Sequence, residues 1–150
     1  MTISLPDVNV WTALAAEGHI HHVVAREWFA AQPDASVAFC RITQMGLLRL
    51  LTNSSVMGRA PRTIVQAWEV YEQLRGDRRL VFATEPDGVE PVWRLLMTRP
   101  GVGASSWTDA YLAAFAQEHS YSLVTFDTAF ARWAALRLTL LASPEKSAGN

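Results

Sequence analysis

The chain has 150 residues, half of them hydrophobic (50%), and a net charge of −1. This length fits one domain, and the near-neutral charge excludes a large basic surface for nucleic acid. The single cysteine, Cys40, excludes an internal disulfide. No run reaches the roughly 18 apolar residues of a membrane span, so we expect a soluble, cytoplasmic protein without contact to a membrane.

Short apolar runs alternate with longer amphipathic runs along the chain. In chain order we expect a strand at 3–5, helices at 8–18 and 21–31, a strand at 36–40, a helix through 47–51, a helix at 62–75, a strand at 80–82, helices at 90–97 and from 109, a strand at 121–125, a helical segment at 128–136 and a strand at 138–141. This alternation predicts an α/β domain over residues 1–142 with a mostly parallel sheet, followed by a flexible tail at 143–150.

The helix at 62–75 shows an amphipathic pattern. The side chains expected to face inward are Ile64, Val65, Trp68, Tyr71 and Leu74. Together with the helices of residues 8–31, this helix is expected to offer apolar surface to a partner helix or to a second copy of the chain.

Three aspartates stand where a strand ends or a helix begins. Asp7 follows the first strand, Asp127 follows the strand at 121–125, and Asp109 opens a helix. Capping explains each of them singly, because aspartate is favoured at helix N-termini and Ser106 to Asp109 fit a capping box. In an open parallel sheet, however, side chains at the carboxyl ends of the strands converge on one crevice, which capping does not require.

Clustered carboxylates without cysteine or histidine partners suit Mg²⁺, with Mn²⁺ as a substitute. Such an ion polarises a phosphodiester and helps to generate a nucleophile from water, so that no protein nucleophile is needed. The histidines at 19, 21 and 22 lie in a predicted helix–helix turn and lack the i, i+4 pairing of zinc motifs. The sequence therefore favours a hard-metal site for phosphoryl chemistry at the aspartates.

Three segments carry a family resemblance: residues 5–9 (LPDVN), 108–114 (TDAYLAA) and 123–130 (LVTFDTAF). In order and spacing they resemble the motifs of PIN-domain ribonucleases, above all of VapC-type toxins from bacterial toxin–antitoxin pairs. The resemblance implies a PIN-like three-layer α/β fold, with a mostly parallel five-stranded sheet flanked by helices. It also implies a Mg²⁺-dependent endoribonuclease, the toxin of a type II toxin–antitoxin system, that cuts RNA with metal-activated water and is inhibited by a cognate VapB-like antitoxin. A homodimer is expected by the same analogy.

By this resemblance, Asp7, Asp109 and Asp127 take the metal-binding and catalytic acidic positions, and Thr125 takes the hydroxyl position beside the last acid. The chain departs from the family pattern in one respect. The family usually places a glutamate on the helix after the second strand, but residues 35–68 contain no acidic residue.

The glutamate position falls on or near Gln44 or Gly46. Gln44 brings no charge but can hydrogen-bond a metal-bound water or a phosphate. Fewer negative ligands weaken the affinity for a metal and disfavour a second, closely spaced ion.

Two alternatives remain open from the sequence. A PIN-like module that has lost its catalytic site would bind a partner without cutting RNA, and the missing glutamate favours it. An aspartyl-phosphate phosphohydrolase would also begin with an acid after the first strand. That class holds the phosphoryl group with a lysine, and the sole lysine here is Lys146 in the tail.

Arginine supplies nearly all the positive charge. The candidates for bidentate phosphate contacts are Arg41, Arg49, Arg59, Arg62 and Arg132. Among the aromatic residues, Trp11 and Trp107 stand near the acids in sequence, with packing as their first expected role and base stacking as the second. Nothing in the sequence specifies the RNA target.

Overall fold

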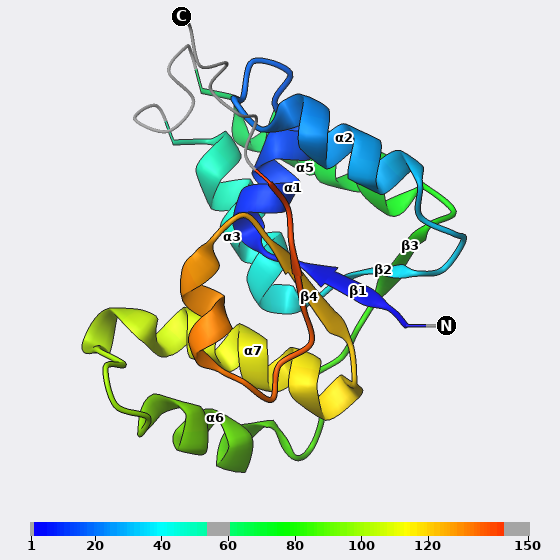
Figure 1. Ribbon diagram of the computed structural model, residues 1–150. Coiled ribbons are helices and arrows are strands. Elements are labelled where there is room, and N and C mark those ends of the chain that lie inside the picture. The colour runs from blue at the N-terminus through cyan, green and yellow to red at the C-terminus, as the bar shows by residue number, and fades with distance from the viewer. Residues whose placement is uncertain (1, 54–60, 143–150) are drawn as a thin grey trace, which may run out of the picture.

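The computed structural model describes residues 2–53 and 61–142, and within them helices cover both faces of a central sheet (Figure 1). The tail expected at 143–150 and the candidate Arg59 lie outside the described residues. In the described part of the chain, no helix is long and apolar enough to cross a membrane.

The strands are short and all parallel. They are β1 (Ser4–Pro6), β2 (Val37–Phe39), β3 (Leu80–Phe82), β4 (Ser122–Thr125) and β5 (Leu138–Leu140). Their order in the sheet is β3-β2-β1-β4-β5, and each neighbouring pair is parallel. The predicted α/β class with a five-stranded parallel sheet is therefore confirmed.

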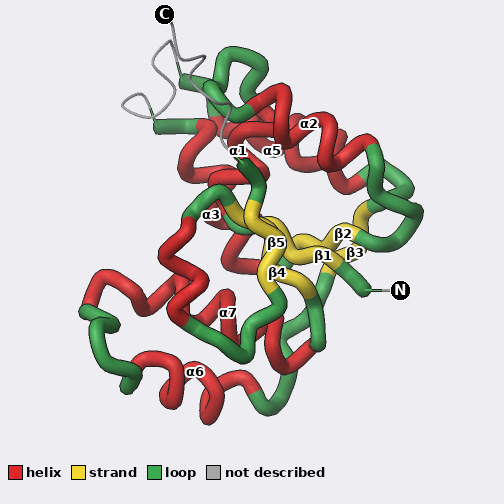
Figure 2. Tube along the Cα trace, viewed as in Figure 1, coloured by secondary structure: helices red, strands yellow, loops and turns green. Residues whose placement is uncertain are grey.

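The helices form the two outer layers. They are α1 (Val8–Ala15), α2 (His22–Ala30), α3 (Arg41–Leu51), α5 (Ile64–Arg75), α6 (Val89–Met97) and α7 (Trp107–His119), with 3₁₀ helices η1 (Ala104–Ser106) and η2 (Thr128–Arg132). Figure 2 shows α1, α2, α3 and α5 on one side of the sheet and α6 and α7 on the other, which is the predicted three-layer arrangement.

A separate apolar core fills the space on each face of the sheet. On the side of α1, α3 and α5, the ring of Trp11 stacks on Phe39 with 3.8 Å between the centroids. On the side of α6 and α7, Phe115 packs with Leu5 and Leu123. Because both faces of a parallel sheet are covered, its strands consist of apolar runs rather than alternating patterns.

Two predicted helices are shorter than expected. The first ends at Ala15 rather than at residue 18, because Ala16 takes an extended conformation with φ −116° and ψ 103°. At 128–136, only the short 3₁₀ helix η2 forms. Trp133 is extended there and buries its ring, with its indole N–H donating to the carbonyl of Leu96, and this contact turns the chain toward β5.

The inward face predicted for α5 is wrong in its first half. Ile64 and Val65 are 72% and 67% exposed, whereas Ala67 and Tyr71 carry the buried face. The helix packs on α3 and β3, with Ala67 of its first turn buried in that contact and Ile64 and Val65 of the same turn largely exposed. An exposed apolar face on this helix was itself expected, and it is present.

The close approach of α1 and α3 depends on Gly46. A Cβ atom on Gly46 would lie 2.5 Å from Cγ2 of Val8, a β-branched side chain with little freedom to move. We expect Gly46→Ala to lower the free energy of unfolding by about 1–2 kcal/mol, since overpacking outweighs the helix propensity that alanine adds. Chemical denaturation measures the change. Gly18→Ala is the control, because its Cβ would meet nothing within 4 Å, and equal stability of both variants would contradict the argument.

Candidate active site

The two central strands carry two of the predicted acids to one edge of the sheet. Pro6 of β1 pairs with Val124 of β4, and the backbone N–H of Asp7 donates to the carbonyl of Val124 over 2.9 Å. From β1 the chain continues to β2 and β3 on one side, whereas β4 and β5 lie on the other. The carboxyl ends of β1 and β4 therefore border the topological switch point, where ligands of open α/β sheets bind.

Thr125, the last residue of β4, joins these two strand ends. Its hydroxyl donates to Oδ2 of Asp7 over 2.5 Å and accepts from the backbone N–H of Asp127 over 3.0 Å. The side chain is fully buried. One hydroxyl thus holds the Asp7 carboxylate and the backbone at Asp127 in a common geometry.

Asp7 is a buried carboxylate with an unusual affinity for its proton. Its side chain is 6% exposed, and its Oδ1 accepts from the backbone N–H of Val10 as the N-cap of α1. Burial raises the pKa of Asp7 to about 6, although the hydrogen bonds from Thr125 and Val10 lower it. The negative charges of Asp109 and Asp127 raise it further. The group therefore sits in a site that disfavours negative charge unless a cation is near.

Asp109 and Asp127 complete this acidic site. Asp109 lies in the first turn of α7, half-buried, and burial together with the charge of Asp127 raises its pKa, while Arg132 lowers it. Asp127 is exposed and caps η2 by accepting from the backbone N–H of Ala129. The structure thus brings the three aspartates within electrostatic reach of one another.

Two aspartates of this site cap helices, and all three converge in space. Asp7 and Asp127 cap helices as the conservative interpretation predicted. The capping box expected at Ser106 is wrong, because Ser106 makes no side-chain cap hydrogen bond to α7. Asp109 instead stands in the first turn of α7, where the helix dipole favours a carboxylate, but the nearby charge of Asp127 opposes its ionisation.

Gln44 stands in the first turn of α3, after β2, and is 5% exposed. Its Oε1 accepts from the guanidinium of Arg41 over 2.5 Å, and this guanidinium lies over the ring of Phe82. No hydrogen bond among the described residues joins Gln44 to the aspartates. The structure therefore does not place this amide in the network that Thr125 organises.

Other candidates are not assembled into sites. His19 and His21 lie in the turn between α1 and α2, and His22 is the first residue of α2. The described residues contain no group of three His, Cys, Asp or Glu side chains arranged as a ready-made metal cage. Cys40 is buried, and burial raises the pKa of its thiol. Trp11 is buried in the core, as its packing interpretation predicted, whereas Trp107 is 55% exposed.

One hydrogen bond close to Asp109 was not predicted from the sequence. The hydroxyl of Tyr111 donates to Glu85 over 2.5 Å, and both side chains line a pocket that also includes Thr108, the neighbour of Asp109. The two residues are 26 positions apart, so no local pattern connects them. The only local signal in the sequence was Trp107, an aromatic residue two positions before Asp109 at the start of the helix.

Comparison with known proteins decides the family. The model of the PIN domain family matches residues 4–136, which include all three aspartates. The chain belongs to the PIN domain family. Within it, the chain is 45% identical over 143 residues to Ribonuclease VapC41 of Mycobacterium tuberculosis, covering 92% of this chain and 98% of that protein.

Solved structures agree with this PIN fold. VapBC2 from Rickettsia felis, bound to a DNA fragment from its promoter, superposes with a TM-score of 0.68 at 16% identity, covering 93% of this chain and 99% of that one. A toxin–antitoxin complex from Klebsiella pneumoniae superposes with a TM-score of 0.60 at 17% identity, covering 89% of this chain and 94% of that one. At these identities the likeness shows the fold alone, and the predicted PIN-like fold is confirmed.

Proposed function

We propose that this PIN domain is an endoribonuclease that cuts RNA phosphodiesters with the help of Mg²⁺, for which Mn²⁺ can substitute. We further propose that it is the toxin of a type II toxin–antitoxin system. The observation that carries the proposal is the convergence of Asp7, Asp109 and Asp127 at the switch-point edge of the sheet, in a site that raises the pKa of Asp7 to about 6. The similarity to a named VapC ribonuclease supports the same activity.

The donor set fits a hard divalent cation. Carboxylate oxygens are the ligands that Mg²⁺ takes, and it commonly uses one or two of them together with water and phosphate oxygens. A complete cage of three protein ligands is therefore not required. Asp7 and Asp109 are the proposed ligands, and Asp127 is the third acid, because its charge raises the pKa of both others. When bound, the cation would polarise the phosphodiester and increase the acidity of water.

The remaining residues position these groups. Thr125 holds Asp7 by its hydroxyl, so the carboxylate presents a defined geometry without a change of rotamer. Arg132 lowers the pKa of Asp109, and its guanidinium is the group we propose to contact a phosphate of bound RNA. Gln44, engaged with Arg41, supplies a polar group near the end of β2 that we propose orients water or phosphate once RNA displaces that contact.

A catalytically degenerate binding module is the second candidate. It is favoured by the neutral Gln44, whose amide is held by Arg41 where the family usually has a glutamate. The aspartyl-phosphate phosphohydrolase has less support, because Lys146 is the only lysine and lies in the tail. The acid cluster favours the nuclease over the degenerate module, since an idle module gains nothing from carboxylates that repel one another.

The proposed protein partner is a VapB-like antitoxin, in line with the toxin–antitoxin complex among the structural neighbours. The exposed apolar side chains of α5, Ile64, Val65 and Trp68, are suited to cover by a partner helix. The expected homodimer stays a prediction.

The test is cleavage of total cellular RNA by the purified protein. We expect discrete products with Mg²⁺ or Mn²⁺ and intact RNA with EDTA. Asp109→Asn should lower the rate at least about a hundredfold, because it removes charge where the phosphodiester is activated. Asp34→Asn is the matched control, since Asp34 pairs with Arg78 on the surface before β2 and should leave the rate unchanged. Intact RNA with either metal, from folded protein, would favour the binding module.

A further inference from the structure

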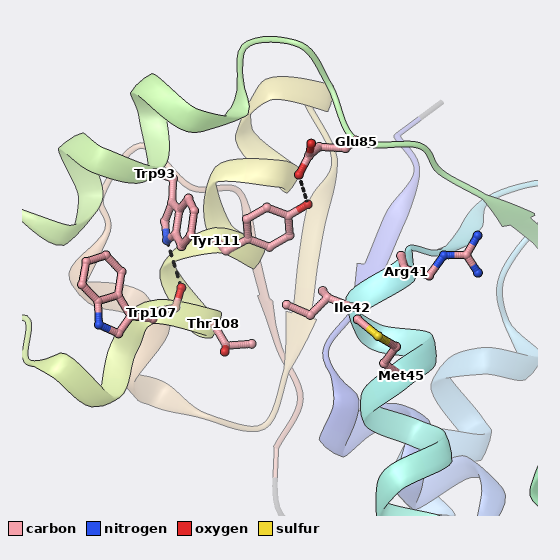
Figure 3. Close-up of a pocket in the computed structure, with 8 residues that line it drawn as sticks. All are labelled: Arg41, Ile42, Met45, Glu85, Trp93, Trp107, Thr108 and Tyr111. Carbon is pink, nitrogen blue, oxygen red and sulfur yellow. Dashed lines mark hydrogen bonds between the residues drawn. The ribbon is translucent and has the colours of Figure 1, made fainter.

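A pocket of about 600 Å³ lies between α3 and the pair α6 and α7 (Figure 3). It is lined by Arg41, Ile42, Met45, Glu85, Trp93, Trp107, Thr108 and Tyr111. Figure 3 shows Ile42 and Met45 on one wall and the aromatic side chains on the opposite wall. The volume is ample for one nucleobase, and the two walls offer apolar surface to both faces of a planar ring.

The aromatic wall is rigid. The indole N–H of Trp93 donates to the backbone carbonyl of Trp107 over 2.9 Å. The ring of Trp93 stands nearly perpendicular to those of Trp107 and Tyr111, with interplanar angles of 82° and 81°. The ring of Trp107 nevertheless remains 55% exposed. A large aromatic face that is held by its backbone but left open to solvent is a stacking surface for a base.

Among the polar side chains of the lining, Arg41 is engaged by Gln44 and Phe82, and Glu85 is the one that offers carboxylate acceptors to a base. Tyr111 donates to one oxygen of Glu85, which fixes the carboxylate at the rim. A carboxylate offers about four acceptor sites, so Glu85 retains several after this bond. In this bond the phenol of Tyr111 is the donor and the carboxylate of Glu85 is the acceptor. Glu85 therefore presents acceptors only, and the edge of a base that meets Glu85 must bring donors.

The pocket is lined by residues of the same two helix turns that carry Asp109 and Gln44. Trp107 and Thr108 directly precede Asp109 in the first turn of α7, and Ile42 and Met45 stand on the turn of α3 that carries Gln44. A strand of RNA with a phosphodiester at the aspartates would place a neighbouring base at this opening. Because Thr108, the neighbour of Asp109, lines the pocket, RNA is favoured here over a partner protein, for which the apolar face of α5 lies on the other layer of the fold.

We propose that this pocket receives an unpaired guanine base of the RNA, next to the phosphodiester held at the acids. The inference rests on the proposed nuclease function and adds a base specificity to it. Guanine presents two adjacent donors, N1–H and the N2 amino group, which match the two oxygens of Glu85. Adenine and cytosine present one amino group beside an acceptor, and an acceptor facing a carboxylate is repelled. Ring stacking on Trp107 adds affinity for any base.

Binding of short oligonucleotides tests the proposal without any need for cleavage. Fluorescein-labelled hexauridylates with one central guanosine or one central adenosine are titrated by anisotropy, in EDTA and in an Asp7→Asn background that leaves the RNA intact. We expect the guanosine probe to bind at least about fivefold more tightly, the difference that one well-formed pair of hydrogen bonds provides. Trp107→Ala should weaken both probes at least about fivefold. Glu85→Gln should remove the preference for guanosine.

Matched controls come from α6, outside the pocket lining. Leu95→Ala removes an apolar side chain as exposed as Trp107, and Glu90→Gln neutralises a surface carboxylate that pairs with Arg94. Both should bind like the parent, and circular dichroism confirms folding of every variant. Equal affinity for the two probes, or a guanosine preference that survives Glu85→Gln, would overturn the proposal.

The two proposals fail separately. A guanosine preference in a protein that cuts no RNA supports the base pocket and contradicts the proposed nuclease activity. Metal-dependent cleavage by a protein without this preference supports the nuclease activity and overturns only the proposed base pocket. If folded protein binds neither oligonucleotide, the base pocket is overturned and the same surface becomes a candidate for a protein partner.

Discussion

Replacing Asp7 with asparagine is expected to abolish metal-dependent RNA cleavage and, in EDTA, to stabilise the protein. The rate should fall at least about a hundredfold, because asparagine keeps the size and the capping oxygen of Asp7 but removes the charge that holds a cation. Stability should rise because the carboxylate is buried beside Asp109 and Asp127, and its pKa of about 6 measures that unfavourable environment. Opposite signs for activity and stability mark a group kept for function.

The sign of the pH dependence follows from the raised pKa of Asp7. The folded value of about 6 lies above the ordinary 3.8, so the proton on Asp7 stabilises the metal-free protein fully below about pH 3.8. That contribution is lost as the pH rises through about 6. A shift of this size corresponds to about 2–3 kcal/mol, at about 1.4 kcal/mol for each pH unit. Asp7→Asn should therefore equal wild type near pH 4 and exceed it by about that amount at pH 7.5.

Urea denaturation at several pH values measures this difference, with and without Mg²⁺. Saturating Mg²⁺ should reduce the advantage of Asp7→Asn, because the cation stabilises only the protein that binds it. Asp34→Asn, which removes a surface carboxylate paired with Arg78, should show neither effect. An Asp7→Asn variant that is less stable at pH 7.5, or that still cuts RNA at the wild-type rate, would contradict the proposed role.

Replacing Thr125 with valine is expected to produce the largest loss of stability at the site. The substitution keeps the shape but removes the hydroxyl that donates to Asp7 and accepts from the backbone of Asp127. The buried carboxylate of Asp7 and the partly buried N–H of Asp127 both lose their partner, which costs about 2–3 kcal/mol. Because this hydroxyl lowers the pKa of Asp7, its loss should raise that pKa, and the acidic limb of the pH–rate profile should move to higher pH.

Thr125→Ser is the matched control, because it keeps the hydroxyl and loses one methyl group, at a cost of about 1 kcal/mol. Its pH–rate profile should follow wild type. A double-mutant cycle of Thr125→Val with Asp7→Asn should be non-additive by about 1 kcal/mol or more, since the two side chains share a hydrogen bond. Strict additivity, or a serine variant that behaves like valine, would show that the hydroxyl does not position Asp7.

Local sequence patterns predicted the bounds of some elements closely. The strand at 121–125 corresponds to β4, and the helix at 21–31 corresponds to α2, within one residue at each end. Predictions failed where a distant contact decides the local conformation. Trp133 ends the helical segment because its ring and indole N–H engage α6. In α5 the contact with α3 buries Ala67 and leaves Ile64 of the same turn exposed, because the position of α3 decides which side of the helix is covered.

The features of the candidate site also divide into those that local sequence signals predict and those that depend on the tertiary structure. The sequence by itself determined that aspartates follow two parallel strands and open one helix, because strand ends and helix starts are local signals, and it determined the family through three short motifs. Only the tertiary structure decided that Thr125, 118 residues away, holds Asp7 and that burial and neighbouring charges raise the pKa of Asp7. The pairing of Tyr111 with Glu85 also needed the fold. Hydrogen-bond partners and desolvation depend on which segments pack together in space. A pattern of neighbouring residues in the sequence does not contain the distances between segments that are far apart along the chain.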